Sequence, residues 1–248
     1  MMTVFRSTDR FDIAALEHDA AVAEAMQPFE SGAYGHCISL PRATDLAATY
    51  RTHHNNIPFS GALDRCPAFR QVFSTFKTGI ASFRLLRRVA HSAYGLHDDR
   101  DKGSGLLRLQ IPIRTNDRSY IAVLKNGVEL EPLARQLAGF SHRQDNLLFD
   151  FQRFCDTFGD RFDLFAFAPG HIHYFDTDTI HTAINAGEQD RVVLAIDLVR
   201  NAWLDQWLVE NLSAPVPATP QSALVADAVW TWNALKHGLL SHPRIDVS

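Results

Sequence analysis

The sequence lacks the features that mark secreted, disulfide-bonded and membrane proteins. Its three cysteines, Cys37, Cys66 and Cys155, form no CxxC pair, which argues against a disulfide framework and a thiolate zinc site. No run approaches the roughly 20 apolar residues that a membrane span needs. The first residues, MMTVFRSTDRFD, also lack the apolar core of a secretion signal. These absences predict a cytoplasmic protein without a membrane partner.

An excess of either charge is missing as well. Across 248 residues, 24 lysines and arginines face 28 aspartates and glutamates, which gives a formal net charge of −4 at pH 7. Such a balance offers no broad attraction for phosphate backbones, so we exclude nucleic acid as a partner. With 46% hydrophobic and 21% charged residues, the composition is that of a globular protein with a sizeable core. The count of 12 histidines is unusual, and the question is whether any of them converge.

Helical and strand-like patterns occupy different parts of the chain. Residues 11–27 and 65–77 carry apolar residues at helical spacing, and Pro67 is acceptable in the first turn of the second helix. From about 80 to 199, short apolar runs follow one another and several alternate with polar residues, which is typical of an antiparallel sandwich or barrel. The strand-like runs are ASFRLLRRVA, LLRLQIPI, SYIAVLKNG, NLLFDFQRF, RFDLFAFA, HIHYFD and RVVLAIDLV.

Turn and linker signals complete this organisation. Asn126-Gly127 predicts a two-residue hairpin turn. The proline-rich residues 213–220 predict an extended connector, and residues 221–237 predict a final helix. The chain shows no internal repeat, so we predict one mainly β domain. Its parts are a helical N-terminal support (1–79), the β core (80–199) and C-terminal helices (200–248).

The first chemical candidate is the segment Leu96-His97-Asp98-Asp99-Arg100. Residues two apart on an extended backbone point to the same face, so His97 and Asp99 could offer a nitrogen and an oxygen to one metal ion. A solvated charged loop is the alternative, because His-x-Asp is common by chance.

The second candidate joins His181 to Arg191, ten residues later, across a turn at Asn185-Ala186-Gly187. A buried arginine in this place would bind a carboxylate with its planar fork. The alternative is a packed His181 and an Arg191 that pairs at the surface with Glu188 or Asp190.

Together the two segments hold two histidines and one carboxylate, the donor set of non-haem Fe(II) oxygenases. The order His97, Asp99, a long strand-rich stretch, His181 and Arg191 fits a double-stranded β-helix, in which distant strands become neighbours.

A family likeness rests on the segments His97-x-Asp99, Arg108–Asn116 (RLQIPIRTN), Pro169–Asp176, His181–Asn185 and Asp190–Asp197. In these segments the chain resembles the aspartyl/asparaginyl β-hydroxylase-like branch of the Fe(II)/2-oxoglutarate oxygenases, which includes bacterial proline hydroxylases. The resemblance covers residues 80–199 and implies a double-stranded β-helix (jelly-roll, cupin-like) core with flanking N- and C-terminal helices.

The resemblance also implies roles for site residues. His97, Asp99 and His181 would be the catalytic Fe(II) ligands. Asp99 favours hydroxylation over halogenation, since related halogenases replace this carboxylate by a small residue.

Three further residues would serve 2-oxoglutarate. Arg191 would hold its distal carboxylate, and Arg108 would lie near the cosubstrate carboxylate or the metal face. Gln110 stands where relatives often have histidine, and it could still donate a hydrogen bond.

The implied activity is an O2- and 2-oxoglutarate-dependent hydroxylation of an unactivated C–H bond, with succinate and CO2 as co-products. The substrate would be a free amino acid or a small molecule derived from one; an Asp, Asn or other side chain in a peptide, or a carrier-tethered amino acid, is the alternative. Two other classes stay open: a cupin-like metal enzyme that does not use 2-oxoglutarate, against which Arg191 counts, and a non-catalytic barrel that binds a small acid or a partner. A homodimer also stays open.

Other polar residues in the core segment have plainer interpretations. His171 and His173 are expected to be packed or surface histidines. Arg84 and Arg88 share one face of a strand-like run and Arg87 lies on the other, with solvated positions expected for all three.

Overall fold

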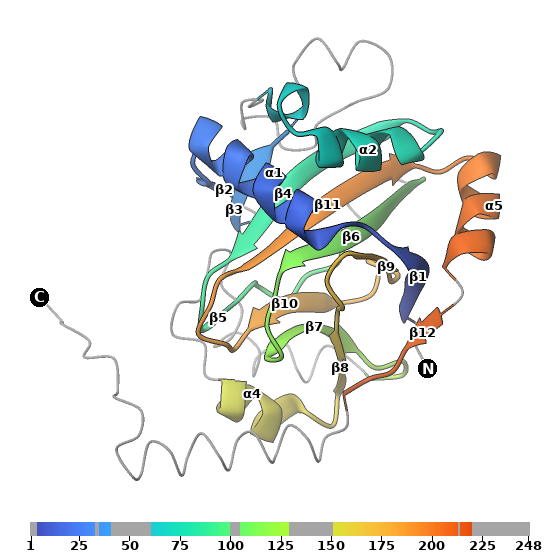
Figure 1. The fold of residues 1–248 in the computed structure, drawn as a ribbon. Coiled ribbons are helices and arrows are strands. Elements are labelled where there is room, and N and C mark those ends of the chain that lie inside the picture. The colour runs from blue at the N-terminus through green and yellow to red at the C-terminus, as the bar shows by residue number, and fades with distance from the viewer. Residues whose placement is uncertain are drawn as a thin grey trace, which may run out of the picture.

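The computed structural model describes residues 4–32, 35–40, 61–99, 105–128, 151–212 and 214–219. These residues contain two antiparallel β-sheets that lie one over the other, with helices on their outer sides (Figure 1). The strands of the large sheet are β1 (Val4–Arg10), β2 (Glu30–Gly32), β3 (Gly35–Ser39), β4 (Ile80–Arg88), β6 (Leu106–Arg114), β9 (His171–Tyr174), β11 (Arg191–Val199) and β12 (Ala214–Val216). The strands of the small sheet are β5 (Ser92–Ala93), β7 (Ser119–Leu124), β8 (Phe162–Ala166) and β10 (His181–Asn185).

The order of the strands is that of a double-stranded β-helix. The large sheet runs β12-β1-β9-β6-β11-β4-β3-β2, and the small sheet runs β5-β10-β7-β8. From β6 onward the chain passes back and forth between the sheets: β6 is in the large sheet, β7 and β8 in the small one, then β9 large, β10 small and β11 large. The predicted class, mainly β with a jelly-roll core and flanking helices, is confirmed.

Both predicted N-terminal helices are present. α1 (Ile13–Met26) begins at Asp12, whose side chain accepts hydrogen bonds from the first backbone amides of the helix. α2 (Pro67–Thr75) has its proline in the first turn, where the missing N–H costs no hydrogen bond. α4 (Phe151–Phe158) and α5 (Ala202–Asn211) follow the core strands. No helix in the described part of the chain is long and apolar enough to cross a membrane.

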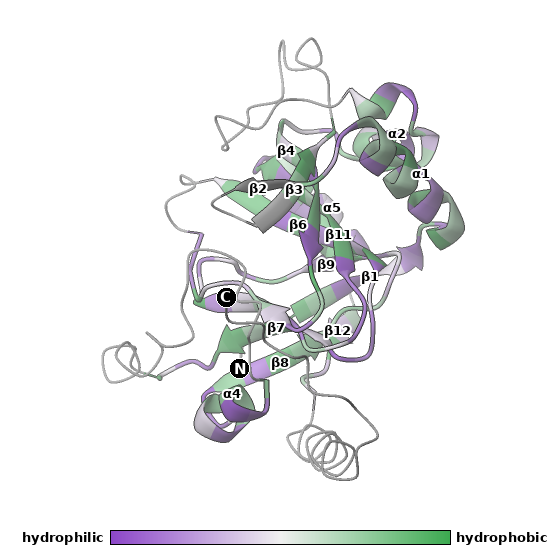
Figure 2. Cartoon of the chain, turned by 90° about the vertical axis from the view of Figure 1, so that its left-hand side faces the viewer, coloured by the Kyte–Doolittle hydropathy of each residue, from purple (hydrophilic) through white to green (hydrophobic). Residues whose placement is uncertain are grey.

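Three apolar layers result from the alternation of side chains along the strands. Leu107, Leu109 and Ile111 on β6 face α1 and α2, in a cluster that also includes residues of β4 and β11. α4 covers the outer face of the small sheet, and a third cluster lies between the sheets. Figure 2 shows that the helices carry both hydrophobic and hydrophilic residues.

One predicted strand is wrong. The run NLLFDFQRF was interpreted as a strand, but its described part, from Phe151, begins helix α4. Phe151, Phe154 and Phe158 recur at helical spacing and are all buried against the small sheet, where the ring of Phe151 stacks on Tyr120. The helical period of these three phenylalanines, rather than the alternation at the start of the run, determined the local structure.

The Asn126-Gly127 hairpin is also corrected. The turn forms, and Gly127 has a φ of 81°, a left-handed conformation that glycine adopts without strain. However, β7 pairs with β10 on one edge and with β8 on the other, so the turn does not lead into a neighbouring strand. The turn signal was correct, and the strand pairing inferred from it was wrong.

The two ends of the chain contribute more strand than their patterns predict. Besides α1 and α2, residues 1–79 supply β1, β2 and β3 to the large sheet. The predicted extended connector at residues 213–220 contains β12, which pairs with β1. The predicted helix at residues 221–237 lies outside the described residues.

Asp19 joins the two helices that cover the large sheet. Its side chain is buried on α1, and Oδ2 accepts a hydrogen bond of 2.9 Å from the backbone N–H of Phe69 in the first turn of α2. The residue before α2, Cys66, makes no capping hydrogen bond through its side chain. Asp19 therefore caps α2 from a neighbouring helix, which fixes how the two helices pack.

We expect Asp19→Ala to lower the free energy of unfolding by about 1–3 kcal/mol, because a buried N–H loses its acceptor. Asp19→Asn, which keeps an acceptor oxygen, should lose less. Urea denaturation measures the difference, and Glu17→Ala, on the exposed face of the same helix, is the matched control. Equal stability of Asp19→Ala and Glu17→Ala would contradict the capping role.

Candidate active site

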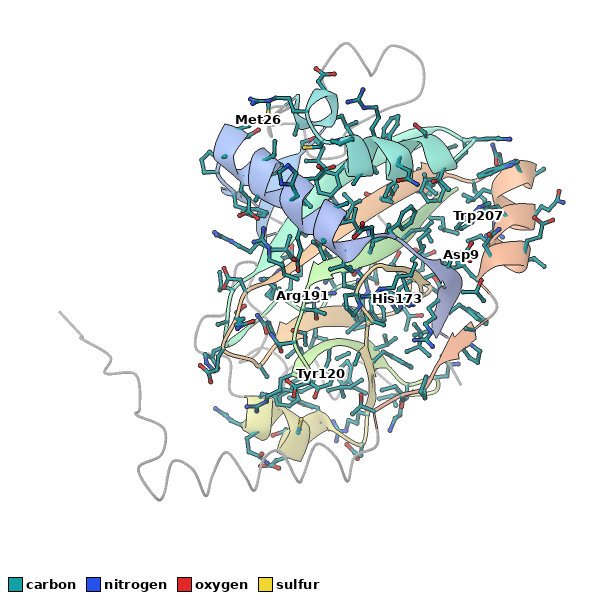
Figure 3. The ribbon with its side chains drawn as sticks, in the orientation of Figure 1. Asp9, Met26, Tyr120, His173, Arg191 and Trp207 are labelled. Atoms are coloured by element: carbon teal, nitrogen blue, oxygen red, sulfur yellow. The ribbon has the colours of Figure 1, made fainter. Side chains whose placement is uncertain are left out.

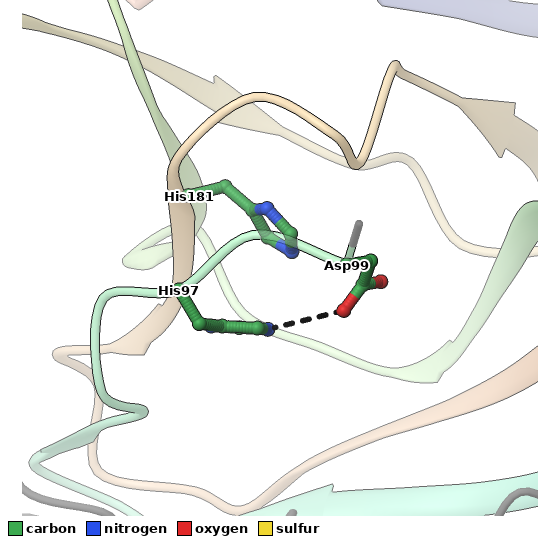
Figure 4. A group of neighbouring side chains, drawn as sticks. All are labelled: His97, Asp99 and His181. Atoms are coloured by element: carbon green, nitrogen blue, oxygen red, sulfur yellow. Dashed lines mark ion pairs between the residues drawn. The ribbon is translucent and has the colours of Figure 1, made fainter. Parts of the chain in front are cut away.

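The predicted metal-ligand residues converge. His97 and His181 face each other across a backbone bridge, in which His181 N donates to His97 O at 2.8 Å and His97 N donates to His181 O at 3.1 Å. Asp99 is held beside them by a hydrogen bond from its backbone N–H to the carbonyl of Thr177. One ligand atom from each of the three side chains lies within 4.8 Å of the other two (Figure 4).

Both histidines have an orientation that suits a metal ligand. Nδ1 of His97 lies 2.8 Å from the carbonyl oxygen of Gly95, and Nδ1 of His181 lies 2.8 Å from that of Thr179. A carbonyl oxygen only accepts, so each Nδ1 carries the proton and each Nε2 has a lone pair. Such a hydrogen bond on the far nitrogen is the usual support of a metal-bound imidazole.

The surroundings of His181 keep it neutral. Burial, and then the neighbouring His97, lower the pKa of His181 to about 3, although Asp99 acts in the opposite direction. The ring of Phe175 packs edge-on against the ring of His181, with the ring centroids 5.1 Å apart. The ring of Tyr94 packs edge-on against that of His97, with the centroids 4.8 Å apart. The donor nitrogens therefore sit in an aromatic surround that holds the rings in place.

Arg108 lies beside the cluster of His97, Asp99 and His181. Its Nη1 donates to Asp99 Oδ2 at 2.8 Å, while its Nε and Nη2 donate to the two oxygens of Asp197 at 2.6 and 2.9 Å. Burial alone would lower the pKa of Arg108, but Asp197 and then Asp99 raise it above its ordinary value. The guanidinium thus bridges two buried carboxylates and stays charged.

Arg191 is buried at the start of β11, the strand that pairs with β6. Its Nη2 lies 3.4 Å from Oε1 of Gln110, and burial together with the neighbouring Arg88 lowers the pKa of Arg191 to about 10. The surface pairing considered for Arg191 is not what the structure has, because Arg191 is only 4% exposed and its side chain contacts Gln110 on the inner face of β6. Glu188 pairs instead with His91, and Asp190 with Arg87.

Strand β6 links the two halves of the site. Arg108 contacts Asp99 of the histidine cluster, and Gln110, two residues along, contacts Arg191. Residues two apart share a face of the strand and are separated by roughly 7 Å. The inner face of β6 therefore contacts the histidine cluster through Arg108 and contacts Arg191 through Gln110.

The turn before Arg191 is clamped by Asn185. Its buried Nδ2 donates to the carbonyls of Arg88 and Gln189, and its Oδ1 accepts from Asn116. Gly187 lies against the side-chain amide of Asn116, and a Cβ at Gly187 would come within 2.4 Å of Asn116 Oδ1. These contacts fix the entry of the chain into β11 and hence the position of Arg191.

The solvated positions predicted for Arg84 and Arg88 are wrong. The two residues share one face of β4, as predicted, but that face points into the barrel and their exposed fractions are 3% and 6%. Arg84 lies 3.4 Å from Asp197, and Arg88 stands over the ring of Tyr94. Arg87, on the opposite face, is partly exposed and pairs with Asp190.

Sequence reasoning gave no role to Asp197. Its signal was nevertheless present, because Asp197 follows Arg191 by six residues in an otherwise apolar strand and therefore lies on the same face. A charge on that face must be buried with the arginine, and so needs a partner of its own.

The sequence matches no protein-family model and no curated protein. Among solved structures, the chain aligns with iron-bound HygX from Streptomyces hygroscopicus over 81% of its length and 83% of that chain, at 10% identity and a TM-score of 0.50. An oxidoreductase of the 2OG-Fe(II) oxygenase family from Burkholderia pseudomallei aligns over 77% of this chain and 81% of its own, at 18% identity and a TM-score of 0.44. The HygX likeness concerns the fold, and it agrees with the jelly-roll class.

His173 is a packed histidine, as predicted, inside the barrel. Its ring stacks on Phe167 at 4.3 Å, and Nε2 lies 3.0 Å from the carbonyl of Ala168. Among the described residues, Nδ1 has no hydrogen-bond partner. Figure 3 shows His173 and Arg191 between the two sheets. Burial, which outweighs the hydrogen bond to Ala168, lowers the pKa of His173 to about 4.

This low pKa predicts an acid-sensitive fold. The unfolded chain takes up a proton at His173 near pH 6.5, whereas the folded chain does so only near pH 4. Stability is therefore complete above pH 6.5 and falls as the pH drops toward 4, by about 3 kcal/mol from this residue.

We expect His173→Gln to remove much of this loss, as measured by urea denaturation at pH 7 and at pH 4.5. His18→Gln, on the exposed face of α1, controls for the loss of one histidine. An unchanged difference between the two pH values in His173→Gln would contradict the assignment.

Proposed function

We propose that this protein is an Fe(II)- and 2-oxoglutarate-dependent oxygenase that hydroxylates a C–H bond of a small molecule. The observation that carries the proposal is the pairing, along β6, of a two-histidine, one-carboxylate cluster with a buried arginine. Two imidazoles and one carboxylate with open positions are typical of non-haem Fe(II) oxygenases. HygX, which has the same fold, was solved with iron bound.

The donor set fits Fe(II). His97 and His181 each turn Nε2 toward the cluster while Nδ1 faces a carbonyl oxygen, and Asp99 presents a carboxylate oxygen, so the three side chains would hold the ion. The bound iron supplies the redox chemistry in which O2 and 2-oxoglutarate are consumed and succinate and CO2 are released. The hydrogen bonds on Nδ1 keep the two rings from turning away.

The cosubstrate is held by residues of β6 and β11. Arg191 binds the distal carboxylate of 2-oxoglutarate, which restores a charged partner to a desolvated guanidinium. Gln110, which contacts Arg191, would donate its amide N–H to the same carboxylate of 2-oxoglutarate. Arg108 contacts the candidate metal ligand Asp99, so it lies near the opposite end of the cosubstrate. A metal enzyme that does not use 2-oxoglutarate would have no use for this anchor.

Part of the site is dry. Arg191 is buried, and Phe175, which packs against His181, belongs to an apolar cluster between the sheets that also includes Val4, Ile121, Val123, Phe165 and Phe167. A dry surround strengthens the arginine–carboxylate attraction and protects a reactive centre from side reactions.

The finer assignment concerns family branch and substrate. The His97-x-Asp99 and His181–Arg191 spacings support membership in the aspartyl/asparaginyl β-hydroxylase-like branch. We propose a free amino acid, or a small molecule derived from one, as the substrate, and the cytoplasm as the place of action.

An anaerobic titration tests the cosubstrate assignment. Addition of Fe(II) and then 2-oxoglutarate should produce a visible metal-to-ligand charge-transfer band, and Arg191→Met should weaken 2-oxoglutarate binding by about 100-fold, because a buried charge-assisted pair is lost. The band should return at high 2-oxoglutarate.

Arg114→Met is the matched control, since Arg114 lies on β6 but pairs with Glu24 on α1. No band with the wild-type protein would refute the proposed function. Metal binding without a band would indicate a metal enzyme that does not use 2-oxoglutarate, and no metal binding would indicate a non-catalytic barrel.

A substrate screen tests the finer assignment. Amino acids added singly to the iron-loaded protein with 2-oxoglutarate should stimulate succinate release in at least one case, and the product should gain one oxygen atom by mass spectrometry. His181→Ala should abolish the stimulation. Stimulation by peptides containing Asp or Asn, with none by free amino acids, would overturn the small-molecule assignment.

A further inference from the structure

The two oxygens of Asp99 have different surroundings. Oδ1 lies 3.7 Å from Nε2 of His97, whereas Oδ2 accepts a hydrogen bond of 2.8 Å from Nη1 of Arg108. The carboxylate is buried, with an exposed fraction of 6%. Oδ1 is therefore turned toward the histidine cluster and Oδ2 toward β6.

Arg108 is itself held from a neighbouring strand. Its Nε and Nη2 form two parallel hydrogen bonds to Asp197, which lies directly opposite on β11. This fork-to-fork arrangement fixes the plane of the guanidinium, which leaves Nη1 aimed at Asp99. Arg84, on the other side of β11, also contacts Asp197.

We propose that Arg108 is a positioning residue that fixes the rotation of the Asp99 carboxylate, so that Asp99 offers only Oδ1 to a metal ion; this inference rests on the proposed metal site. Asp99 follows the β-bridge at His97, and its backbone N–H donates to the carbonyl of Thr177. That hydrogen bond places the main chain of Asp99, and the hydrogen bond from Arg108 orients its carboxylate.

The consequence concerns the number of open positions at the metal. A carboxylate that binds through one oxygen leaves more positions for other ligands than one that binds through both. Asp197 balances the charge of Arg108, so the guanidinium orients Asp99 while a second carboxylate shares its positive charge. Arg108 thus acts through Asp99, and Asp197 acts through Arg108.

A Co(II) titration tests this role without 2-oxoglutarate or turnover, because the visible ligand-field spectrum of Co(II) reports its coordination. The principal variant is the double change Arg108→Met with Asp197→Asn. It removes one positive and one negative charge from the buried cluster of Arg84, Arg108, Asp99 and Asp197, so the net charge of the cluster is unchanged, which is less destabilising than removal of one charge alone. Asp197→Asn alone and Arg114→Met are the comparison variants, and thermal unfolding without metal measures the stability of each.

We expect the double variant to bind Co(II) about 10- to 100-fold more weakly, as is usual when the support of a metal ligand is lost. Its Co(II) spectrum should change, because Asp99 can then turn. Asp197→Asn should lose less affinity, since Arg108 still donates to Asp99, and Arg114→Met should match the wild type. Arg108→Lys should recover part of the affinity, because an ammonium still donates a hydrogen bond.

A folded double variant with wild-type Co(II) affinity and spectrum would overturn the positioning role and leave the proposed function intact. A loss of affinity in all variants in proportion to their thermal stability would also overturn it. Normal Co(II) results with no charge-transfer band on addition of Fe(II) and 2-oxoglutarate would refute the proposed function alone. No Co(II) binding by the wild type would overturn both.

Discussion

The register between β6 and β11 is the constraint on which the rest of the site depends. It sets Gln110 opposite Ala195 and Arg108 opposite Asp197, with the charged side chains on the face inside the barrel. A slip of one residue would turn that face outward and bring Leu109 and its neighbours inside. Burial of those apolar residues against α1 and α2 therefore fixes the register, and the register fixes the site.

The charged groups inside the barrel are of two kinds. Arg108 is paired with two carboxylates, an arrangement whose Coulomb attraction offsets the desolvation of its charge. Arg191 has instead a neutral contact with Gln110 at 3.4 Å, and its pKa is lowered to about 10. The first kind of site is complete in the protein itself. A carboxylate ligand would give the second kind a strong partner, as the proposed function requires of Arg191.

Local patterns in the sequence predicted strands β4, β6, β7, β8, β9 and β11, helices α1 and α2, and the candidate His97, Asp99 and His181 cluster, because alternation and residue spacing express them directly. The same patterns missed what depends on distant packing. The period of β4 shows that Arg84 and Arg88 share a face, but it cannot say whether that face meets solvent or the inside of a barrel. Strands β1 to β3 and β12 likewise form because the large sheet offers them edges to pair with.

The three candidate ligands differ in what holds them. His97 and His181 are held by backbone hydrogen bonds to each other, and each Nδ1 faces a backbone carbonyl oxygen. Main-chain atoms therefore determine the positions of both rings. Asp99 relies on the side chain of Arg108, which belongs to β6. Strand β6 thus contacts Arg191 through Gln110 and the candidate metal ligand Asp99 through Arg108. If the proposed function holds, a substitution that shifts β6 against β11 would disturb metal binding and dicarboxylate binding together, whereas one near His97 would disturb metal binding alone.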